Sequence, residues 1–355
     1  MALLDIALAY YRFMRALTRR TQDATRRLWL EVELADLDGS YGSLADRMLV
    51  TVAAAQLLAA QRAGPYLDAA LAAQGAGADA LGRLVPTSLA GVASDGRSLD
   101  DLLYGSAVRV KTALASGEAP PRALASGEAS LLRIAGTQVQ DTGRAAVAVG
   151  MVARPSVTGW VRVLNPPSCG RCAVLAGRRY RSEEIGNFNR HENCDCTAAP
   201  LAEDTADDLR TDPDAYFRSL TREDQDRYFT TAGAQAIRDG ADIGQVVNAR
   251  RGARGLSQPG RLTDAEQRTL RGGRDRGRLE RVDVYGRQVL TTTDGTTVRA
   301  VAGKRLAEPG GAVKVEGQRH RRAKTSRLMP DAILEIAGDD REERVRLLKR
   351  LGYIT

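Results

Sequence analysis

The sequence predicts a mostly α-helical α+β protein with three regions. Residues 1–155 are expected to form an all-helical assembly module, 156–252 a small zinc-containing α+β domain, and 253–355 a basic region with a β-hairpin and terminal helices. Three observations predict this: apolar residues recur at helical spacing through the first region, all four cysteines lie together in the second, and Thr-rich strand-like segments occur in the third.

The N-terminal half is predicted to be a set of helices. Residues 1–36 are expected to form one long helix, because Ile6, Tyr10, Phe13 and Leu17 recur at helical spacing. A break at Asp38-Gly39-Ser40 and a stop at Gly64-Pro65 then delimit the next helix. The expected ranges are 43–62, 66–73, 78–84, 99–115 and 129–152. The repeat ALASGEA at 113–119 and 123–129 indicates a duplication within a helix–turn connection.

The second half is predicted to mix strands and short helices. Trp160–Asn165 alternates like a half-buried strand, and Pro166-Pro167 ends it. Residues 282–301 are predicted to be a hairpin with its turn at Asp294-Gly295, followed by a basic loop at 303–324. Residues 252–260 are rich in Gly and Arg and predict a linker. Helices are expected at 221–240, 241–250, 263–270, 330–338 and 339–351.

Composition indicates the compartment in which the chain is made. Four clustered cysteines argue against a secreted disulfide scaffold, where cysteines are dispersed. The N-terminus lacks the basic region of a signal peptide, and we find no uncharged apolar run of about 18 residues for a transmembrane helix. We therefore expect a protein that is made in the cytoplasm and has no membrane partner.

Positive charge is concentrated in the second half of the chain. The net charge is +8, and Lys and Arg greatly outnumber Asp and Glu between Gly244 and Leu328. This pattern predicts contact with a polyanion or with an acidic protein face, unless the arginines are surface filler of a GC-rich genome. Aromatic residues for base stacking are nearly absent, so DNA contact would be non-specific and salt-sensitive. The candidate contact residues are Arg250, Arg251, Arg254, Arg274, Arg276, Arg278, Arg321, Arg322 and Lys324.

The spacing of cysteine and histidine predicts a metal site. Cys169 and Cys172 form a Cys-x-x-Cys turn, and His191, Cys194 and Cys196 form a His-x-x-Cys-x-Cys group. Thiolate and imidazole together select Zn²⁺, which four protein ligands close into a structural site. Five candidates compete for four positions: Cys169, Cys172 and His191 are the first choices, and the sequence does not decide between Cys194 and Cys196.

Two other interpretations of the cluster stay open, a disulfide or metal-free thiols and a catalytic zinc. Glu192 follows His191, but the chain has no His-Glu-x-x-His motif. Proteolysis finds no support in the residues, because His191 is better explained as a ligand, His320 lies among arginines, and a Gly-x-Ser-x-Gly elbow is missing. We predict no catalytic residue.

The same stretch resembles the Mu F-like minor head proteins of tailed phages, especially actinophage members often labelled capsid maturation protease. The specific part of the resemblance is the Cys/His pattern with Leu175–Arg178, Tyr180, Phe188 and Pro200 around it. Supporting segments are Gly233–Gly240, Val246–Gly252, Met329–Leu334 and Leu347–Tyr353. The resemblance covers the chain from about Gly159 onward.

The resemblance implies a minor capsid protein present in few copies inside the phage head. It would lie near the portal, contact the portal or major capsid protein, and act in head morphogenesis, with a part in DNA packaging or delivery. The alternative from another class is an enzyme, either a prohead protease or a zinc-dependent nuclease. A free-standing DNA-binding protein is the third hypothesis.

Overall fold

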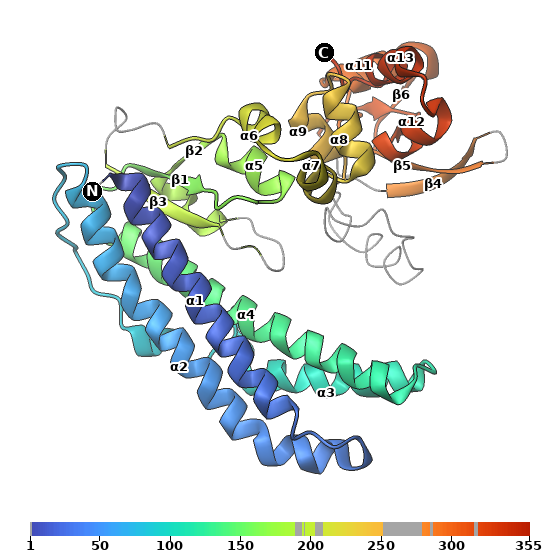
Figure 1. Ribbon diagram of the computed structural model, residues 1–355. Coiled ribbons are helices and arrows are strands. Elements are labelled where there is room, and N and C mark those ends of the chain that lie inside the picture. The colour runs from blue at the N-terminus through green and yellow to red at the C-terminus, as the bar shows by residue number, and fades with distance from the viewer. Residues whose placement is uncertain are drawn as a thin grey trace. The chain divides into compact units, whose positions relative to one another are not determined.

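The computed structural model of the protein describes residues 2–188, 194, 196–202, 209–250, 279–284, 287–315 and 319–355. These residues form mostly helices with three small sheets (Figure 1), which confirms the predicted mostly α, α+β class. The chain divides into two compact units. Unit 1 comprises Met1–Asn165 and Arg178–Arg210, and unit 2 comprises Pro166–Gly177 and Thr211–Thr355. The predicted domain boundaries after residues 155 and 252 stay predictions.

Unit 1 contains four long helices, labelled in Figure 1. They are α1 (Leu3–Trp29), α2 (Leu37–Ala72), α3 (Leu99–Ala115) and α4 (Pro120–Val152), with short 3-10 helices η1 (Leu34–Asp36) and η2 (Pro86–Leu89) between them. The predicted range 99–115 is confirmed as α3. The first helix ends earlier than predicted, at Trp29, and no helix forms at 78–84.

Helix α2 passes through the stop that was predicted at Gly64-Pro65, and that prediction was wrong. Buried residues recur every third or fourth position along α2, from Leu37 to Leu71, and Tyr66 and Leu67 directly follow the proline. Packing of this stripe outweighs the hydrogen bond that a proline removes from a helix. The start also differs, because Asp36 rather than Ser43 caps the helix by accepting the Gly39 N–H at 3.1 Å.

The segment Leu34–Ala72 also has the length and apolar composition of a membrane span, whereas no such segment was expected. Among the described residues it is the one helix that meets this test. Its buried stripe packs against α1, α3 and α4. A core helix of a bundle has the same composition, so the finding does not distinguish the two.

Helix α4 begins at Pro120, earlier than the predicted residue 129. Pro120 and Pro121 occupy its first turn, where a missing N–H costs nothing. The second copy of the ALASGEA repeat therefore lies within α4. The first copy ends α3 and makes the turn at Gly117, whose φ is +85°. The duplication supplies the end of one helix and the start of the next.

Close packing in the bundle depends on glycine in α4. A Cβ added at Gly127 would lie 2.4 Å from Val110 and 2.6 Å from the Trp29 ring. Gly143 faces Met14 and Gly150 faces Leu67 in the same way. These glycines let α1, α2 and α3 approach α4 closely.

A three-stranded antiparallel sheet completes unit 1. The strands are β1 (Gly159–Val163), β2 (Arg179–Arg181) and β3 (Thr197–Leu201), in the order β2-β1-β3, and the short helix η3 (Ser182–Asn187) follows β2. Every residue of β1 is buried, so the predicted half-buried strand was wrong. Trp160 and Val161 belong to the same core cluster as residues of α1, α2 and α4, which explains the burial.

Polar side chains of α2 form hydrogen bonds to the backbone of this sheet and so hold it against the bundle. The Tyr66 hydroxyl donates to the Ala198 carbonyl at 2.8 Å. The Gln74 amide donates to the Pro200 carbonyl and accepts the Ala202 N–H, both at 3.0 Å. The outer edge of β3 is therefore paired with a side chain.

Unit 2 is built of short elements. Its helices are α5 (Gly170–Ala176), α6 (Pro213–Ser219), α7 (Arg222–Phe229), α8 (Thr231–Arg238), α9 (Ile243–Ala249), α11 (Val301–Gly310), α12 (Pro330–Ala337) and α13 (Arg341–Arg350). Its strands are β4 (Leu279–Val284), β5 (Arg287–Thr292), β6 (Ala312–Val313), β7 (Arg322–Ala323) and β8 (Arg327–Leu328). They form the sheets β4-β5-β8 and β6-β7.

Several predicted elements of unit 2 are corrected. The helix expected at 221–240 is two helices, because Thr230 has a φ of +67° and caps α8 through the Gly233 N–H. The hairpin turn is not at Asp294-Gly295, since Val284 pairs with Arg287. The expected loop at 303–324 contains most of α11. The expected linker at 252–260 and the helix at 263–270 lie outside the described residues.

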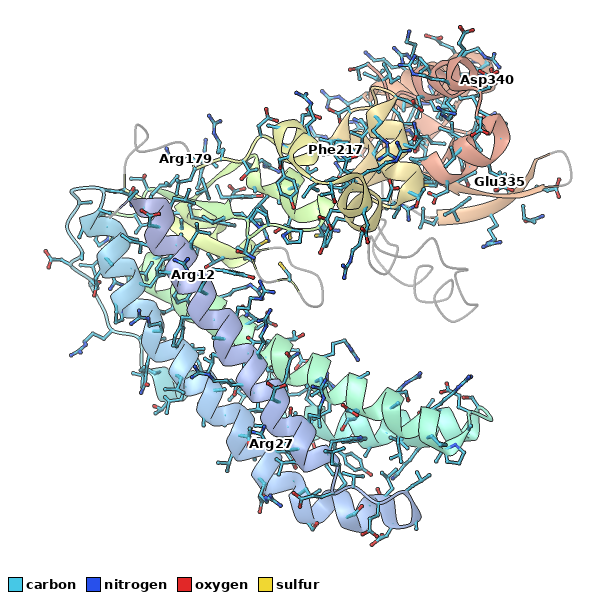
Figure 2. All side chains as sticks on the ribbon, in the orientation of Figure 1. Arg12, Arg27, Arg179, Phe217, Glu335 and Asp340 are labelled. Carbon is cyan, nitrogen blue, oxygen red and sulfur yellow. The ribbon has the colours of Figure 1, made fainter. Side chains whose placement is uncertain are left out.

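The last two helices agree with prediction. Pro330 occupies the first turn of α12. Asp340, labelled in Figure 2, caps α13 by accepting the Glu343 N–H at 3.1 Å, one residue later than the predicted cap. The carboxylate of Asp340 also complements the positive end of the helix dipole.

A buried arginine lies at the centre of unit 2. Arg327 is fully buried, with its guanidinium carbon 3.5 Å from the centre of the Tyr353 ring. Its Nε donates to the Leu351 carbonyl at 2.7 Å, and the Tyr353 hydroxyl donates to the Leu328 carbonyl at 2.9 Å. Burial disfavours the charged form of each group, so it lowers the pKa of Arg327 and raises that of Tyr353.

We expect Gly127→Ala to destabilise the bundle, because its Cβ collides with Val110 and Trp29. Overpacking costs typically 1–3 kcal/mol and alanine regains about 1 kcal/mol of helix propensity, so the net loss in the free energy of unfolding is about 1 kcal/mol. Gly105→Ala in α3 is the matched control, because nothing lies within 4 Å of its added Cβ. Urea unfolding should show the control equal to or more stable than wild type. Equal stability of both variants would contradict the close packing.

Candidate metal centre

The cysteine cluster is built on two connections of the β2-β1-β3 sheet. The chain between β1 and β2 carries Cys169 at the cap of α5 and Cys172 in its first turn. The Cys169 sulfur accepts the Cys172 N–H at 3.4 Å, which fixes the Cys-x-x-Cys turn. Cys194 and Cys196 lie on the chain just before β3. Two short connections of this sheet thus carry all four cysteines.

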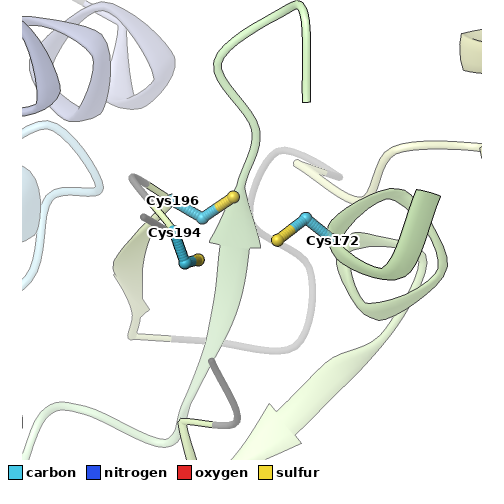
Figure 3. A group of neighbouring side chains, drawn as sticks. All are labelled: Cys172, Cys194 and Cys196. Atoms are coloured by element: carbon cyan, nitrogen blue, oxygen red, sulfur yellow. The ribbon is translucent and has the colours of Figure 1, made fainter. Parts of the chain in front are cut away.

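Three of the thiols meet. The sulfurs of Cys172, Cys194 and Cys196 all lie within 4.8 Å of one another, and each residue is at most 4% exposed (Figure 3). Zn–S bonds of about 2.3 Å at tetrahedral angles place sulfurs about 3.8 Å apart, so small rotations would bring the three to ligating distance. None of the four cysteines is part of a disulfide. The arrangement can hold a metal ion.

The structure brings some of the predicted metal ligands together and leaves others apart. The choice between Cys194 and Cys196, which the sequence left open, is not needed, because both sulfurs join Cys172. Cys169 is partly exposed and outside this group of three. His191 lies outside the described residues. A fourth ligand from Cys169 or His191 stays a prediction.

A buried arginine faces the thiols. Arg162, at the centre of β1, is 1% exposed, and its Nη1 lies 3.7 Å from the Cys194 sulfur. Its guanidinium carbon is 3.9 Å from the centre of the Phe188 ring. Three thiolates on a divalent ion leave a net charge of −1, and a guanidinium at this position offsets that charge where water does not reach.

A second arginine holds the backbone of the Cys194–Cys196 loop. Arg144, on α4, donates from Nη2 to the Cys194 carbonyl and from Nε to the Cys196 carbonyl at 3.4 Å. Its Nη1 pairs with Asp141 at 3.0 Å, and both side chains are largely buried. The fork geometry of a guanidinium suits this bridging of two carbonyls. The long helix of the bundle therefore positions two of the thiols.

Sequence reasoning missed both arginines. The signal for Arg162 was present, because a charged residue interrupts the otherwise apolar WVRVLN, but the alternation suggested that it faces solvent. Arg144 lies 50 residues before Cys194, and no local pattern joins them.

The candidate polyanion contacts differ in their exposure. Arg250 is 5% exposed, and its Nη2 pairs with the Asp331 carboxylate at 2.6 and 2.5 Å, so it supports α12 and offers nothing to a polyanion. Arg321 and Lys324 are exposed, and Arg322 is half-buried in β7. The other five, which lie outside the described residues, are Arg251, Arg254, Arg274, Arg276 and Arg278.

Comparison with known proteins gives one match. The model of a protein family described as VG15 protein matches residues 5–222, more than half of the chain. The matched range contains the four long helices, the β2-β1-β3 sheet and all four cysteines. No curated protein and no solved structure matches the chain.

We expect Arg162→Gln to weaken metal binding, because the neutral amide no longer offsets the thiolate charge. Loss of an outer partner of metal ligands typically lowers affinity 10- to 100-fold. The measurement is competition for the bound metal with a chromogenic chelator. Arg179→Gln is the control, because Arg179 is partly exposed on β2 and donates to Thr158. Equal affinities of the two variants would contradict this role of Arg162.

We expect Arg250→Ala to destabilise unit 2 by about 3 kcal/mol, the lower end for breaking a buried ion pair, because Asp331 keeps some solvent contact. Arg321→Ala removes the same charge from an exposed position and should change the free energy of unfolding by less than about 0.5 kcal/mol. Chemical unfolding followed by circular dichroism compares the two. Similar values for both variants would show that the Arg250–Asp331 pair contributes nothing.

Proposed function

The chain belongs to the VG15 protein family, a phage-associated family, and from this membership we propose that it is a minor capsid protein acting in head morphogenesis of a tailed phage. The match over residues 5–222 carries the proposal, because it includes the helical bundle and the cysteine cluster together. The resemblance to Mu F-like minor head proteins also supports it, and the supporting segments of that resemblance extend past residue 222 to Tyr353.

We propose that the metal is zinc and that its role is structural. Buried thiols are soft ligands, which favour Zn²⁺ over Mg²⁺ or Ca²⁺. Cys172, Cys194 and Cys196 would supply three ligands, and Cys169 or His191 the fourth. Such a closed site fastens the turn after β1 to the chain that leads into β3. Zinc would thus take the place of core residues in a small sheet.

The surface of unit 1 supports a role in assembly. Leu30, Val50 and Leu58 are large apolar residues with 75%, 66% and 49% exposure. Exposed apolar residues of this kind suit contact with other subunits, and we propose the portal or the major capsid protein as the partner. The protein would then lie in the capsid interior after assembly in the host cytoplasm.

A basic face of α1 supports non-specific contact with packaged DNA. Arg12, Arg15, Arg19 and Arg20 are exposed, and α1 has no acidic residue between Asp5 and Asp23. Figure 2 labels Arg12 on this helix. Arginines spaced along a helix can neutralise phosphates without reading bases. These residues add to Arg321 as candidate contacts.

Quantitative mass spectrometry of purified proheads and mature virions tests the proposed function. We expect the intact chain at a few copies in both particles, with both termini detected. Absence from both particles would exclude a head protein.

The same measurement separates the enzyme alternative. A prohead protease would occur in proheads only, together with newly trimmed coat protein in virions. Substituting Cys172 by Ser gives a second comparison, since a structural metal site should lose folding, whereas a catalytic one should leave a folded and inactive protein.

A further inference from the structure

Unit 2 carries a groove outside the metal site that is lined in part by core residues of the unit. Its volume is about 490 Å³, within the range typical of binding sites. Helices α11 and α13 and the β4-β5-β8 sheet contribute its walls. The apolar side chains that line it are Val282, Leu306, Leu328, Leu347 and Leu351. Figure 1 shows these elements together near the C-terminal end of the chain.

Among the described residues, those that line the groove carry positive charge at its margin and no negative charge. Lys324 and Arg350 line it and are exposed, and none of its lining residues is acidic. Within the described ranges, neither cation has an ion pair with a carboxylate. Two solvated cations therefore flank an apolar floor.

We propose that this groove docks an acidic amphipathic segment of a partner protein. Carboxylates of the segment would pair with Lys324 and Arg350, and its apolar side chains would cover Val282 and Leu328, the apolar lining residues that are not buried. A helix that presents apolar residues three and four positions apart is the form that usually fills such a groove. The inference does not depend on the proposed role in the phage head.

The apolar floor decides between two classes of polyanion. Duplex DNA could neutralise Lys324 and Arg350, but its phosphates and sugars would leave the partly exposed Val282 and Leu328 uncovered. A protein segment satisfies both features at once, because charge at the rim steers encounter and apolar burial supplies most of the affinity. Lys324, which the sequence suggested as a polyanion contact, is thereby assigned to a protein partner.

The test uses the full chain and a fluorescein-labelled peptide of about 14 residues, with Leu or Phe at helical spacing and Glu at most other positions. Fluorescence anisotropy measures its affinity. We expect saturable binding that weakens with salt and with replacement of the apolar residues by Ser. The double variant Lys324→Glu, Arg350→Glu should bind at least about tenfold more weakly, as expected for reversal of two charge pairs.

The matched control is Lys304→Glu, Lys349→Glu, since these lysines are exposed on α11 and α13 but do not line the groove. It should bind within about twofold of wild type. Val282→Ser, a change at a groove residue that is 39% exposed, should also weaken binding while leaving the fold intact. The inference is overturned by absence of saturable binding, by equal loss in both double variants, or by unchanged affinity of the Ser-substituted peptide. Tighter binding of duplex DNA, lost in the Lys324→Glu, Arg350→Glu variant, would assign the groove to nucleic acid and overturn it as well.

Discussion

A buried guanidinium stacked on an aromatic ring is the interaction on which both units depend. Arg162 covers Phe188 in unit 1, and Arg327 covers Tyr353 in unit 2, with each arginine almost completely buried. Only 5% of the residues are aromatic, so the two cores have few large apolar side chains. A stacked arginine fills comparable volume, and its donors hold neighbouring backbone carbonyls or a thiol. Burial of these charges is costly unless every partner is in place, which makes each core sensitive to loss of one contact.

This constraint also explains the surroundings of the cysteine cluster. Phe188 stacks on Trp160, which in turn stacks on Tyr180, with ring centres 5.5 and 4.2 Å apart. Arg162 lies against this aromatic stack on one side and the Cys194 sulfur on another. Cys172, Cys194 and Cys196 are thus buried beside this stack, and Arg144 holds the backbone of the loop that carries two of them. A metal ion bound here would add to a partly formed site and would not have to organise it alone.

The fold was predictable where local signals and tertiary packing agree. The bounds of α3 match because its apolar stripe ends where Gly117 makes a turn. Helix α2 was divided wrongly because proline is a strong local signal, and only the buried stripe on both sides of Pro65 shows that the helix continues. The hairpin turn was misplaced because Asp-Gly favours a turn, whereas the pairing of Val284 with Arg287 shows that β4 and β5 are joined between those two residues. For the site, cysteine spacing predicted the cluster, but Arg144 and Arg162 depend on contacts that no sequence period encodes.

The Gln74 amide at the edge of β3 has a consequence for how the chain meets other molecules. An open strand edge is a template for pairing with another chain, and it is a common origin of aggregation. Pro200 removes one donor from this edge, and Gln74 occupies the neighbouring acceptor and donor much as an added strand would. The small sheet is therefore closed to strand exchange on that side even in a crowded assembly. Copies of the chain can be concentrated without polymerising through β3, and specific contacts remain to side chains on helices.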